Sequence, residues 1–282
     1  MNTIKIVFLM ALMMALFMGL GYILGGQQGL IIAFVLAAGL NFASYWYSDK
    51  MVLRLYKARP VSEADHPRLW RIVDSVARES EVPMPKVYIV PSKDANAFAT
   101  GRNSANAAVA ATEGILEILD GDELEGVIGH EIAHIQNRDM LIGAIAATFA
   151  GAIGILASIA RWGALLGGVG GRSDRGGGIV LLVTAIVAPL MAMVIRSAIS
   201  RQREFKADAE GGRITGKYLP LASALGKLHR APGRLNLDSR PATANLMIVN
   251  PLSGRGMSSL FSTHPPVEKR IERLKQLARQ AL

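Results

Sequence analysis

The chain has 282 residues, of which 51% are hydrophobic and only 19% are charged, whereas about a quarter of the residues in a soluble globular domain are charged. A chain this apolar must bury its side chains, so an intrinsically disordered protein is excluded, and the absence of cysteine excludes disulfide bonds, thiolate metal ligands and a cysteine nucleophile. Any metal must therefore be bound by His, Asp or Glu, and the net charge of +9 must be interpreted from its distribution along the chain.

The N-terminal residues 1–48 predict a transmembrane hairpin. No charged residue lies between Lys5 and Asp49. Within that stretch, Ile6–Leu24 and Leu30–Tyr47 are each long enough to cross about 30 Å of hydrocarbon as helices, and the polar turn Gly25–Gln28 separates them. A cleaved signal peptide is the alternative, but the first segment is too long for one and a second apolar segment follows it directly.

The polar segment 49–139 predicts a mixed α and β domain. His66–Ser80 has apolar residues at helical spacing, and Lys86–Val90 lies between two prolines and is typical of a short strand. Asn106–Ala111 is a candidate second strand, and Glu113–Leu119 predicts a short helix. Asp122 is a suitable N-cap for the helix that follows.

That helix carries the main chemical motif of the chain, His-Glu-Ile-Ala-His at residues 130–134. On a helix, His130 and His134 lie one turn apart on the same face, so both imidazoles can bind one metal ion. Glu131 is adjacent and can reach a water on that ion. The alternative is a pair of surface histidines that occurs by chance.

Two further uncharged segments, Met140–Ala160 and Gly176–Ile195, predict a second transmembrane hairpin at residues 140–195. The first is rich in Gly and Ala, which allow close helix packing in a bilayer. A buried hairpin inside the soluble domain is the alternative. In the predicted organisation, 49–139 and 196–282 are the two parts of one catalytic domain.

The basic residues orient this arrangement. Four lie in Asp49–Pro60 and four in Arg196–Lys206, whereas the Gly25–Gln28 turn has no charge and the glycine-rich link Gly167–Gly178 has only three charged residues. The positive-inside rule then places both termini and the polar segments in the cytoplasm. Topology and the anionic lipid bilayer explain the net charge, so no nucleic-acid partner is predicted.

A third metal ligand must be another His or an acid, because the chain has no cysteine. A structural zinc site has four protein ligands, whereas a hydrolytic one has three and leaves a position for water. Glu204 and Asp208 lie one helical turn apart, so one carboxylate can bind the metal while the other accepts an N–H from a ligand histidine. The alternative is a solvated helix end with Glu204 paired to Arg201 or Lys206. Near the C-terminus, Pro266–Leu282 predicts an exposed amphipathic helix.

Several segments together resemble the HtpX family of membrane zinc metalloproteases, which belongs with the Ste-type prenyl-protein endopeptidases and more distantly with thermolysin-like enzymes. They are HEIAHIQNRD at His130–Asp139, the acidic pair of Glu204–Asp208, NAFATG at Asn96–Gly101, AATEGILEIL at Ala110–Leu119 and STHPP at Ser262–Pro266. With the four hydrophobic segments, the resemblance extends over nearly the whole chain. It implies an α+β, mainly helical fold, in which a thermolysin-like zinc metalloprotease domain is combined with four transmembrane helices.

The resemblance also implies the roles of the metal-site residues. His130, His134 and Glu204 would bind one Zn²⁺ per chain. Glu131 would be the general base that takes the proton of the attacking water and passes it to the leaving amine. Asp208 would orient His130.

For the substrate, the resemblance implies two further sites. Asn96, Ala97, Phe98 and Ala99 would form the edge strand on which the substrate backbone is laid, although a loop of small residues would have a similar sequence. His264 would stabilise the tetrahedral oxyanion, and a surface histidine before a Pro-Pro turn is the alternative.

The resemblance implies that the function is hydrolysis of misfolded or damaged membrane proteins at the cytoplasmic face of the bacterial inner membrane, as part of quality control and stress response. A dedicated processing protease for lipidated substrates is the alternative within the same class. A non-catalytic metal-binding scaffold is disfavoured because Glu131 is intact. A transporter is disfavoured because the predicted spans have no acidic, basic or histidine side chain. The sequence defines no oligomeric state.

Overall fold

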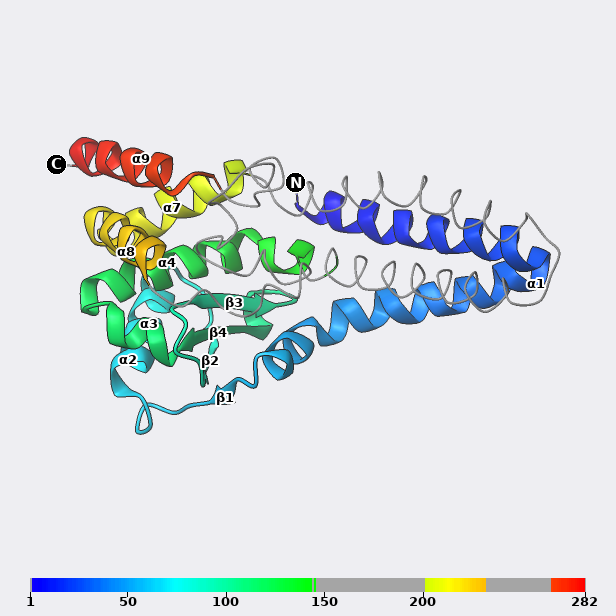
Figure 1. Cartoon of the computed structure of the whole chain (residues 1–282), viewed down its shortest axis with the longest axis horizontal. Helices are drawn as coiled ribbons and strands as arrows, with labels where there is room; N and C mark the ends of the chain where they lie inside the picture. The colour runs from blue at the N-terminus through cyan, green and yellow to red at the C-terminus, as the bar shows by residue number, and fades with distance from the viewer. Residues whose placement is uncertain (1, 144, 146–200, 232–264, 282) are drawn as a thin grey trace, which may run out of the picture. The chain divides into compact units, whose positions relative to one another are not determined.

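A computed structural model of the chain describes residues 2–143, 145, 201–231 and 265–281 (Figure 1). The described residues belong to two compact units: Thr3–Tyr45 lies in one, and Trp46–Gly143 lies in the other together with the described residues from 201 onward. Apart from residues 140–143 and 145, the predicted second hairpin lies outside the described residues, and so does His264.

The first unit contains the N-terminal hydrophobic hairpin. Helix α1 (Asn2–Leu55) is two helices that meet at Gly25 and Gly26, where the backbone is non-helical. Gly26 has φ 58°, a conformation that glycine adopts without steric cost, which explains why the chain reverses there. Thr3–Ile23 and Gly25–Tyr47 are both long and apolar enough to cross a membrane. The predicted four-residue turn is too long, because the backbone is helical again directly after Gly26.

Small residues hold the two arms of this hairpin together. A Cβ atom added to Gly21 would clash with the carbonyl oxygen of Gly29 and with Ala33. Further along, the buried Asn41 side chain donates a hydrogen bond to the carbonyl oxygen of Met10, with Nδ2 3.1 Å from the oxygen. Close backbone approach and an interhelical hydrogen bond are typical of helix pairs in membranes.

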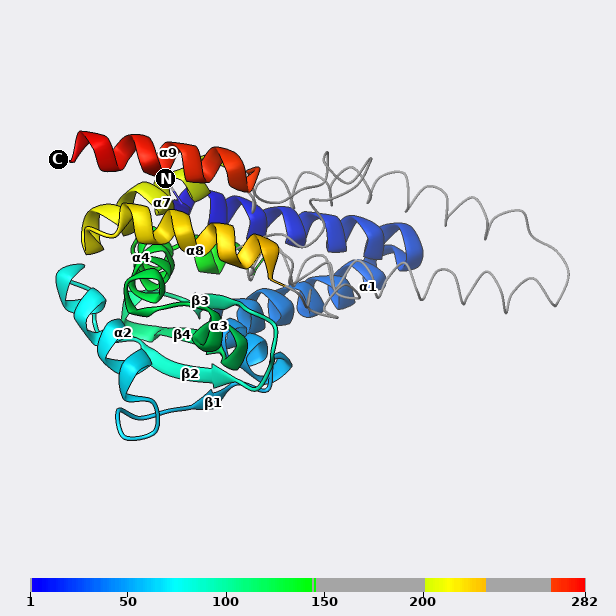
Figure 2. The ribbon, with the colours of Figure 1, turned by 60° about the vertical axis from the view of Figure 1, so that its left-hand side comes forward.

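The second unit is built on a four-stranded sheet with the strand order β1-β2-β4-β3. Strand β2 runs parallel to β4, and β1 and β3 run antiparallel to their neighbours (Figure 2). Because β3 is last in this order, it is an edge strand of the described sheet. The structure confirms the two predicted strands to within one residue. The strands are β1 (Arg59–Pro60), β2 (Lys86–Val90), β3 (Ala97–Gly101) and β4 (Ala107–Thr112).

Helices cover the sheet, and α4 is central among them because it contacts β3, α2, α7 and α8. The predicted helices at 66–80, 113–119 and 266–282 are present, each within two residues of its predicted bounds. The helices of this unit are α2 (Pro67–Glu79), α3 (Glu113–Ile118), α4 (Gly121–Asn137), α7 (Arg201–Thr215), α8 (Tyr218–Arg230) and α9 (Val267–Gln280), with a 3-10 turn at Ser104–Asn106.

The start of α4 differs from the prediction. The N-cap is Asp120 and not Asp122, because Asp120 accepts a hydrogen bond from the backbone N–H of Glu123 at 2.9 Å while the Glu123 side chain accepts one from the backbone N–H of Asp120 at 3.0 Å. This reciprocal capping box satisfies two N–H groups that a helix start leaves unpaired. Asp122 instead points outward and forms an ion pair with Lys217.

The two faces of the sheet contribute to different cores, since side chains alternate along a strand. Ala97 and Ala99 of β3 belong to the larger core that includes α4. Phe98 belongs to a smaller core with Leu53 and Tyr56, the last residues before the sheet begins. Strand β3 is therefore packed between α4 and the chain segment that leads out of the hydrophobic hairpin.

Candidate metal centre

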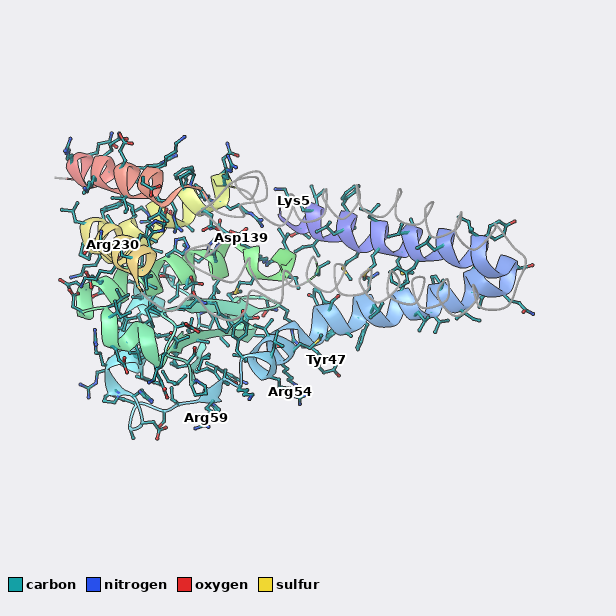
Figure 3. The ribbon with its side chains drawn as sticks, viewed as in Figure 1. Lys5, Tyr47, Arg54, Arg59, Asp139 and Arg230 are labelled. Carbon is teal, nitrogen blue, oxygen red and sulfur yellow. The ribbon has the colours of Figure 1, made fainter. Side chains whose placement is uncertain are left out.

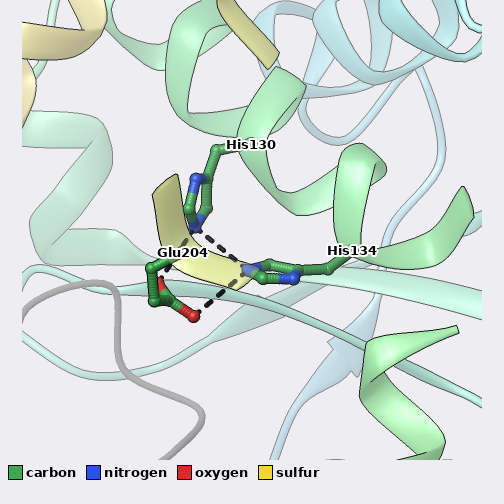
Figure 4. Close-up of side chains that lie close together, drawn as sticks. All are labelled: His130, His134 and Glu204. Atoms are coloured by element: carbon green, nitrogen blue, oxygen red, sulfur yellow. Dashed lines mark hydrogen bonds and ion pairs between the residues drawn. The ribbon is translucent and has the colours of Figure 1, made fainter. Parts of the chain in front are cut away.

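The two histidines of the His-Glu-Ile-Ala-His motif converge on one point (Figure 4). His130 and His134 lie one turn apart on α4, and their Nε2 atoms are 3.2 Å from each other. The two rings are nearly perpendicular, at 89°. Two imidazole nitrogens that face each other at this distance are suited to share a cation.

Glu204 brings a carboxylate to the same point from α7. Its Oε1 lies 3.6 Å from His134 Nε2, and its Oε2 lies 3.7 Å from His130 Nε2. The alternative pairs Glu204 with Arg201 or Lys206. In the structure, Lys206 donates to the side-chain oxygen of Asn137 at 2.7 Å, and Arg270 lies 3.8 Å from Glu204 Oε2.

The three ligand atoms fit a zinc ion. They all lie within 4.8 Å of one another, and the three residues form a potential metal site. Around a tetrahedral Zn²⁺ with bonds of about 2.0–2.2 Å, neighbouring ligand atoms are separated by about 3.3–3.6 Å. The 3.2 Å between the two nitrogens, and the 3.6 and 3.7 Å from them to the two different carboxylate oxygens of Glu204, are close to that spacing.

Two glycines allow α7 to approach α4 closely enough to complete this group. A Cβ atom on Gly211 of α7 would lie 2.5 Å from the backbone nitrogen of His130, and one on Gly129 of α4 would lie 2.7 Å from Thr215 Cγ2. Because Glu204, Asp208 and Gly211 lie on one face of α7, this contact brings both carboxylates to the histidines.

A buried ion pair stands behind His130. Asp208 Oδ1 lies 2.9 Å from His130 Nδ1, and Arg270 of α9 donates to both oxygens of Asp208, at 2.6 and 2.7 Å. Asp208 is 1% exposed and Arg270 0%. Burial alone would raise the pKa of Asp208, but the charge and hydrogen bonds of Arg270 and the hydrogen bond of His130 outweigh it and lower that pKa to about 2. Asp208 is therefore a fixed anion beside the imidazole.

A second carboxylate stands behind His134. Asp139 Oδ2 lies 3.1 Å from His134 Nδ1, and Arg203 lies 3.5 Å from the other oxygen of Asp139. Burial favours the neutral imidazole, but Asp139, Glu204 and Glu131 outweigh burial and raise the pKa of His134 to about 9. A metal that binds there must displace this proton.

Glu131 connects the histidine motif to the sheet. Its side chain is buried, and its Oε2 accepts a hydrogen bond from the backbone N–H of Ala99 in β3 at 2.8 Å. Burial raises the pKa of Glu131, partly offset by the charges of the two histidines and by the Ala99 N–H. The carboxylate is thus placed between the metal ligands and an edge strand.

Comparison with known proteins identifies the family. The model of peptidase family M48 matches residues 63–278. The chain belongs to peptidase family M48. Among its relatives, it is 52% identical over 275 residues to a protease HtpX homolog of Syntrophobacter fumaroxidans, covering 95% of this chain and 97% of the relative. It is 50% identical to a protease HtpX homolog of Thermodesulfovibrio yellowstonii, covering 99% and 100%.

The fold is also similar to that of a solved structure. The crystal structure of S. mikatae Ste24p superposes with a TM-score of 0.55 at 20% sequence identity, over 94% of this chain and 62% of that one. This likeness concerns the fold alone. Together with the two apolar N-terminal helices and the M48 match, the relatives establish the chain as a membrane metalloprotease, which confirms the predicted family and class of enzyme.

The predicted substrate residues lie in and beside β3. Ala97, Phe98 and Ala99 lie in the strand, and Asn96 directly precedes it. Thr112 fixes Asn96, because its backbone N–H and its hydroxyl both donate to the Asn96 carbonyl oxygen while its hydroxyl oxygen accepts the Asn96 N–H. The predicted segment is thus an edge strand and not a loop, anchored where it begins.

Two residues that contact the site are not identified from the sequence. Asp139 faces His134, and Arg270 is paired with Asp208. Asp139 follows His134 by five positions and is acidic where α4 ends, which was a usable signal. Arg270 lies between Val267 and Leu274, on the apolar face of α9, and a charged residue on such a face indicates a buried partner. That partner, Asp208, is 62 positions away in the chain and could not be identified from the sequence alone.

Proposed function

We propose that this membrane metalloprotease is a zinc-dependent endopeptidase that hydrolyses misfolded or damaged membrane proteins at the cytoplasmic face of the bacterial inner membrane. The observation that carries the proposal is the placement of Glu131 between a three-ligand metal group and the backbone of an edge strand. A peptidase needs these three parts side by side: a metal, a base and a surface that holds an extended backbone.

In this proposal, His130, His134 and Glu204 hold one Zn²⁺ per chain. Bound zinc lowers the pKa of a water that it holds to about 7 and polarises the scissile carbonyl. Three protein ligands leave a coordination position for that chemistry, as in hydrolytic zinc sites. Asp208 and Asp139 each face the Nδ1 atom of one histidine, which fixes the ring orientation and leaves Nε2 for the metal.

Glu131 is the proposed general base. It takes the proton of the attacking water and passes it to the nitrogen of the leaving amine. Its raised pKa favours this exchange, because a carboxylate whose pKa is nearer neutrality both accepts and returns a proton readily. The hydrogen bond from Ala99 holds the carboxylate on the side of the site that faces β3.

Strand β3 is the proposed substrate surface. Within the described sheet, β3 pairs with β4 on one side only. The Ala99 N–H is directed to Glu131 and away from β4, so the other edge of β3 faces the catalytic base. A substrate that adds to this edge as a further strand has its backbone aligned beside Glu131.

Several parts of the proposal rest on sequence and resemblance. They are a thermolysin-like arrangement of the catalytic domain, oxyanion stabilisation by His264, four transmembrane helices with a second hairpin at 140–195, and cytoplasmic placement of both termini. The support for the orientation is the four basic residues in Asp49–Pro60 against none in the Gly25–Gln28 turn. A processing protease for lipidated substrates uses the same residues and remains the second candidate.

The decisive experiment is cleavage of a model membrane protein by the purified full chain. With zinc the wild type cleaves, and with a chelator it does not. Glu131→Gln retains the three ligands, so zinc content stays at one per chain while cleavage falls by at least about 100-fold, the contribution of a general base. Cleavage at close to the wild-type rate by zinc-loaded Glu131→Gln would remove Glu131 from its assigned role.

A further inference from the structure

The segment that leaves the hydrophobic hairpin touches the edge strand at two places. Tyr56 packs against Phe98 with ring centroids 4.9 Å apart. The guanidinium of Arg102, the residue directly after β3, lies 4.4 Å from the centroid of the Trp46 ring. Both contacts are within the second unit. They connect Phe98 of β3, and Arg102 at its C-terminal end, to residues 46–56.

Those residues lie at the level of lipid headgroups by sequence. The second apolar helix long enough to span a membrane ends at Tyr47, and Trp and Tyr concentrate at the membrane–water interface. Trp46 and Tyr47 are both partly exposed, at 43% and 46%. Since the guanidinium of Arg102 lies over the Trp46 ring, the C-terminal end of β3 lies next to these residues.

The segment between residues 46 and 60 is strongly basic. Trp46, Lys50 and Arg54 follow one another at intervals of four on a continuous helix, so they lie within an arc of about 80°. Lys50 lies 5.5 Å from the Tyr47 ring centroid, and both Lys50 and Arg54 are exposed. Figure 3 labels Tyr47, Arg54 and Arg59 along this stretch. Asp49 is its one acidic residue between 46 and 60, against four basic ones, so its charge is +3, or +4 with Arg102.

We propose that the basic–aromatic junction, defined as Trp46, Lys50, Arg54 and Arg102, binds the headgroups of anionic phospholipids and thereby holds β3 in position for the peptidase reaction. The guanidinium carbon of Arg102 lies over the Trp46 ring, and a guanidinium presents five N–H donors to a phosphate, which accepts them. The same strand donates the Ala99 N–H to Glu131 three residues earlier. A phosphate on Arg102 is therefore connected to the base through three residues of β3, Gly101, Thr100 and Ala99.

The proposal rests on the role of β3 as the substrate strand for its effect on activity, but not for lipid binding. The two are therefore measured separately. Lipid binding is measured in full-length Glu131→Gln, which cannot degrade itself, by counting phosphatidylglycerol molecules retained in detergent by native mass spectrometry. Activity is measured as the ratio of kcat/KM in vesicles with phosphatidylglycerol to that in vesicles of phosphatidylcholine alone.

Arg102→Gln is the test variant and Arg273→Gln the matched control. Arg273 is an exposed arginine that also lies over an aromatic ring, Phe205 at 5.1 Å, but on the α7–α9 side of the unit. We expect Arg102→Gln to weaken phosphatidylglycerol binding about fivefold, the effect of one cation at an anionic surface. We expect its activity ratio to fall towards one, while Arg273→Gln keeps the wild-type binding and ratio.

The outcomes separate the ideas. Equal retention of phosphatidylglycerol by Arg102→Gln and Arg273→Gln overturns the headgroup site. Weaker retention with an unchanged activity ratio overturns the link through β3. If the wild type cleaves nothing in either lipid, the proposed function fails while the retention result still decides the site. Lys50→Gln, at an exposed helix position, repeats the binding test should Arg102→Gln fail to fold.

Discussion

At the scale of single residues, the two metal-facing histidines have the same kind of supporting contacts, but those of His130 are more deeply buried. Each has a carboxylate at Nδ1 and an arginine behind that carboxylate. The Asp208–Arg270 pair is bidentate and fully buried, whereas Arg203 lies 3.5 Å from an oxygen of Asp139 in a pair that is partly exposed. Breaking a buried pair leaves an uncompensated charge, which costs more than breaking a partly exposed one.

The expected consequence is an unequal loss of zinc. Asp139→Asn should weaken zinc binding by about 10–100-fold, as is usual for a group that orients a ligand, and Asp208→Asn should weaken it more because Arg270 is left buried without its anion. Zinc affinity is measured by competition with a chelator of known affinity. Glu210→Gln, on the same helix but partly exposed and paired to Arg213, is the control. A smaller loss for Asp208→Asn than for Asp139→Asn would contradict this ranking.

The sequence predicts the ligands better than their supports. His130, Glu131 and His134 are set by a local helical spacing, and their meeting in space follows from that spacing. Glu204 and Asp208 were recognised as a pair one turn apart, but their division of roles came only from resemblance. Arg270 becomes part of the site through packing of α9 on α7, and packing between distant segments leaves little trace in one sequence.

At the scale of elements, α4 and α7 form the centre of the catalytic unit, and their separation is set by glycine. Gly211→Ala would place a methyl group 2.5 Å from the His130 backbone nitrogen, so the helices must move apart. We expect zinc affinity to fall about tenfold or more, since overpacking of this kind costs about 1–3 kcal/mol. Gly121→Ala, where an added Cβ meets nothing within 4 Å, should bind zinc as the wild type does.

The start of α4 provides a test by pH. The buried Glu123 carboxylate accepts hydrogen bonds from Lys227, Ser223 and the backbone of Asp120. Burial raises the pKa of Glu123, but these hydrogen bonds outweigh it and the pKa lies below its usual 4.5. The ionised form therefore stabilises the fold above about pH 4.5, and this stabilisation is lost as the pH falls through the lowered value.

Glu123→Gln should accordingly reduce the free energy of unfolding at pH 7 by about 1–3 kcal/mol, the range for hydrogen bonds to a charged group. The difference in Tm between wild type and variant should shrink below pH 4.5. Thermal unfolding in detergent is followed across that range, with the exposed Glu117→Gln as control. A Tm difference that grows on acidification would show that the carboxylate has another role.

Element prediction succeeded where the periodicity was uninterrupted. Helix α2 and strand β2 have clear patterns, and their bounds were predicted within a residue. Helix α8 was not predicted, since Pro220 and Gly226 interrupt its pattern, although proline in the first turn costs no hydrogen bond. Strand β1 has only two residues and pairs with β2 without a pattern of its own.

At the scale of the whole molecule, topology follows from the hairpin and its charges. Reporter fusions after Pro60 and after Leu282 should both report the cytoplasm, and a fusion at Gln27, directly after the Gly25–Gly26 break, should report the opposite side. The number of crossings between Gln27 and Leu282 is then odd: one without the predicted second hairpin and three with it. A cytoplasmic signal at Gln27 would mean that the first hairpin does not cross the membrane.

The ribosome synthesises the site residues in the order in which they stand in the chain. His134 and Arg270 are 136 positions apart, so at about 5–20 residues per second the ribosome adds Arg270 roughly 7–27 s after the histidine. Glu204 is added about halfway through that interval and α9 last. The predicted membrane segments, which end at Ile195, are thus synthesised before the third proposed ligand, so a chain that is still making those segments lacks a complete zinc group.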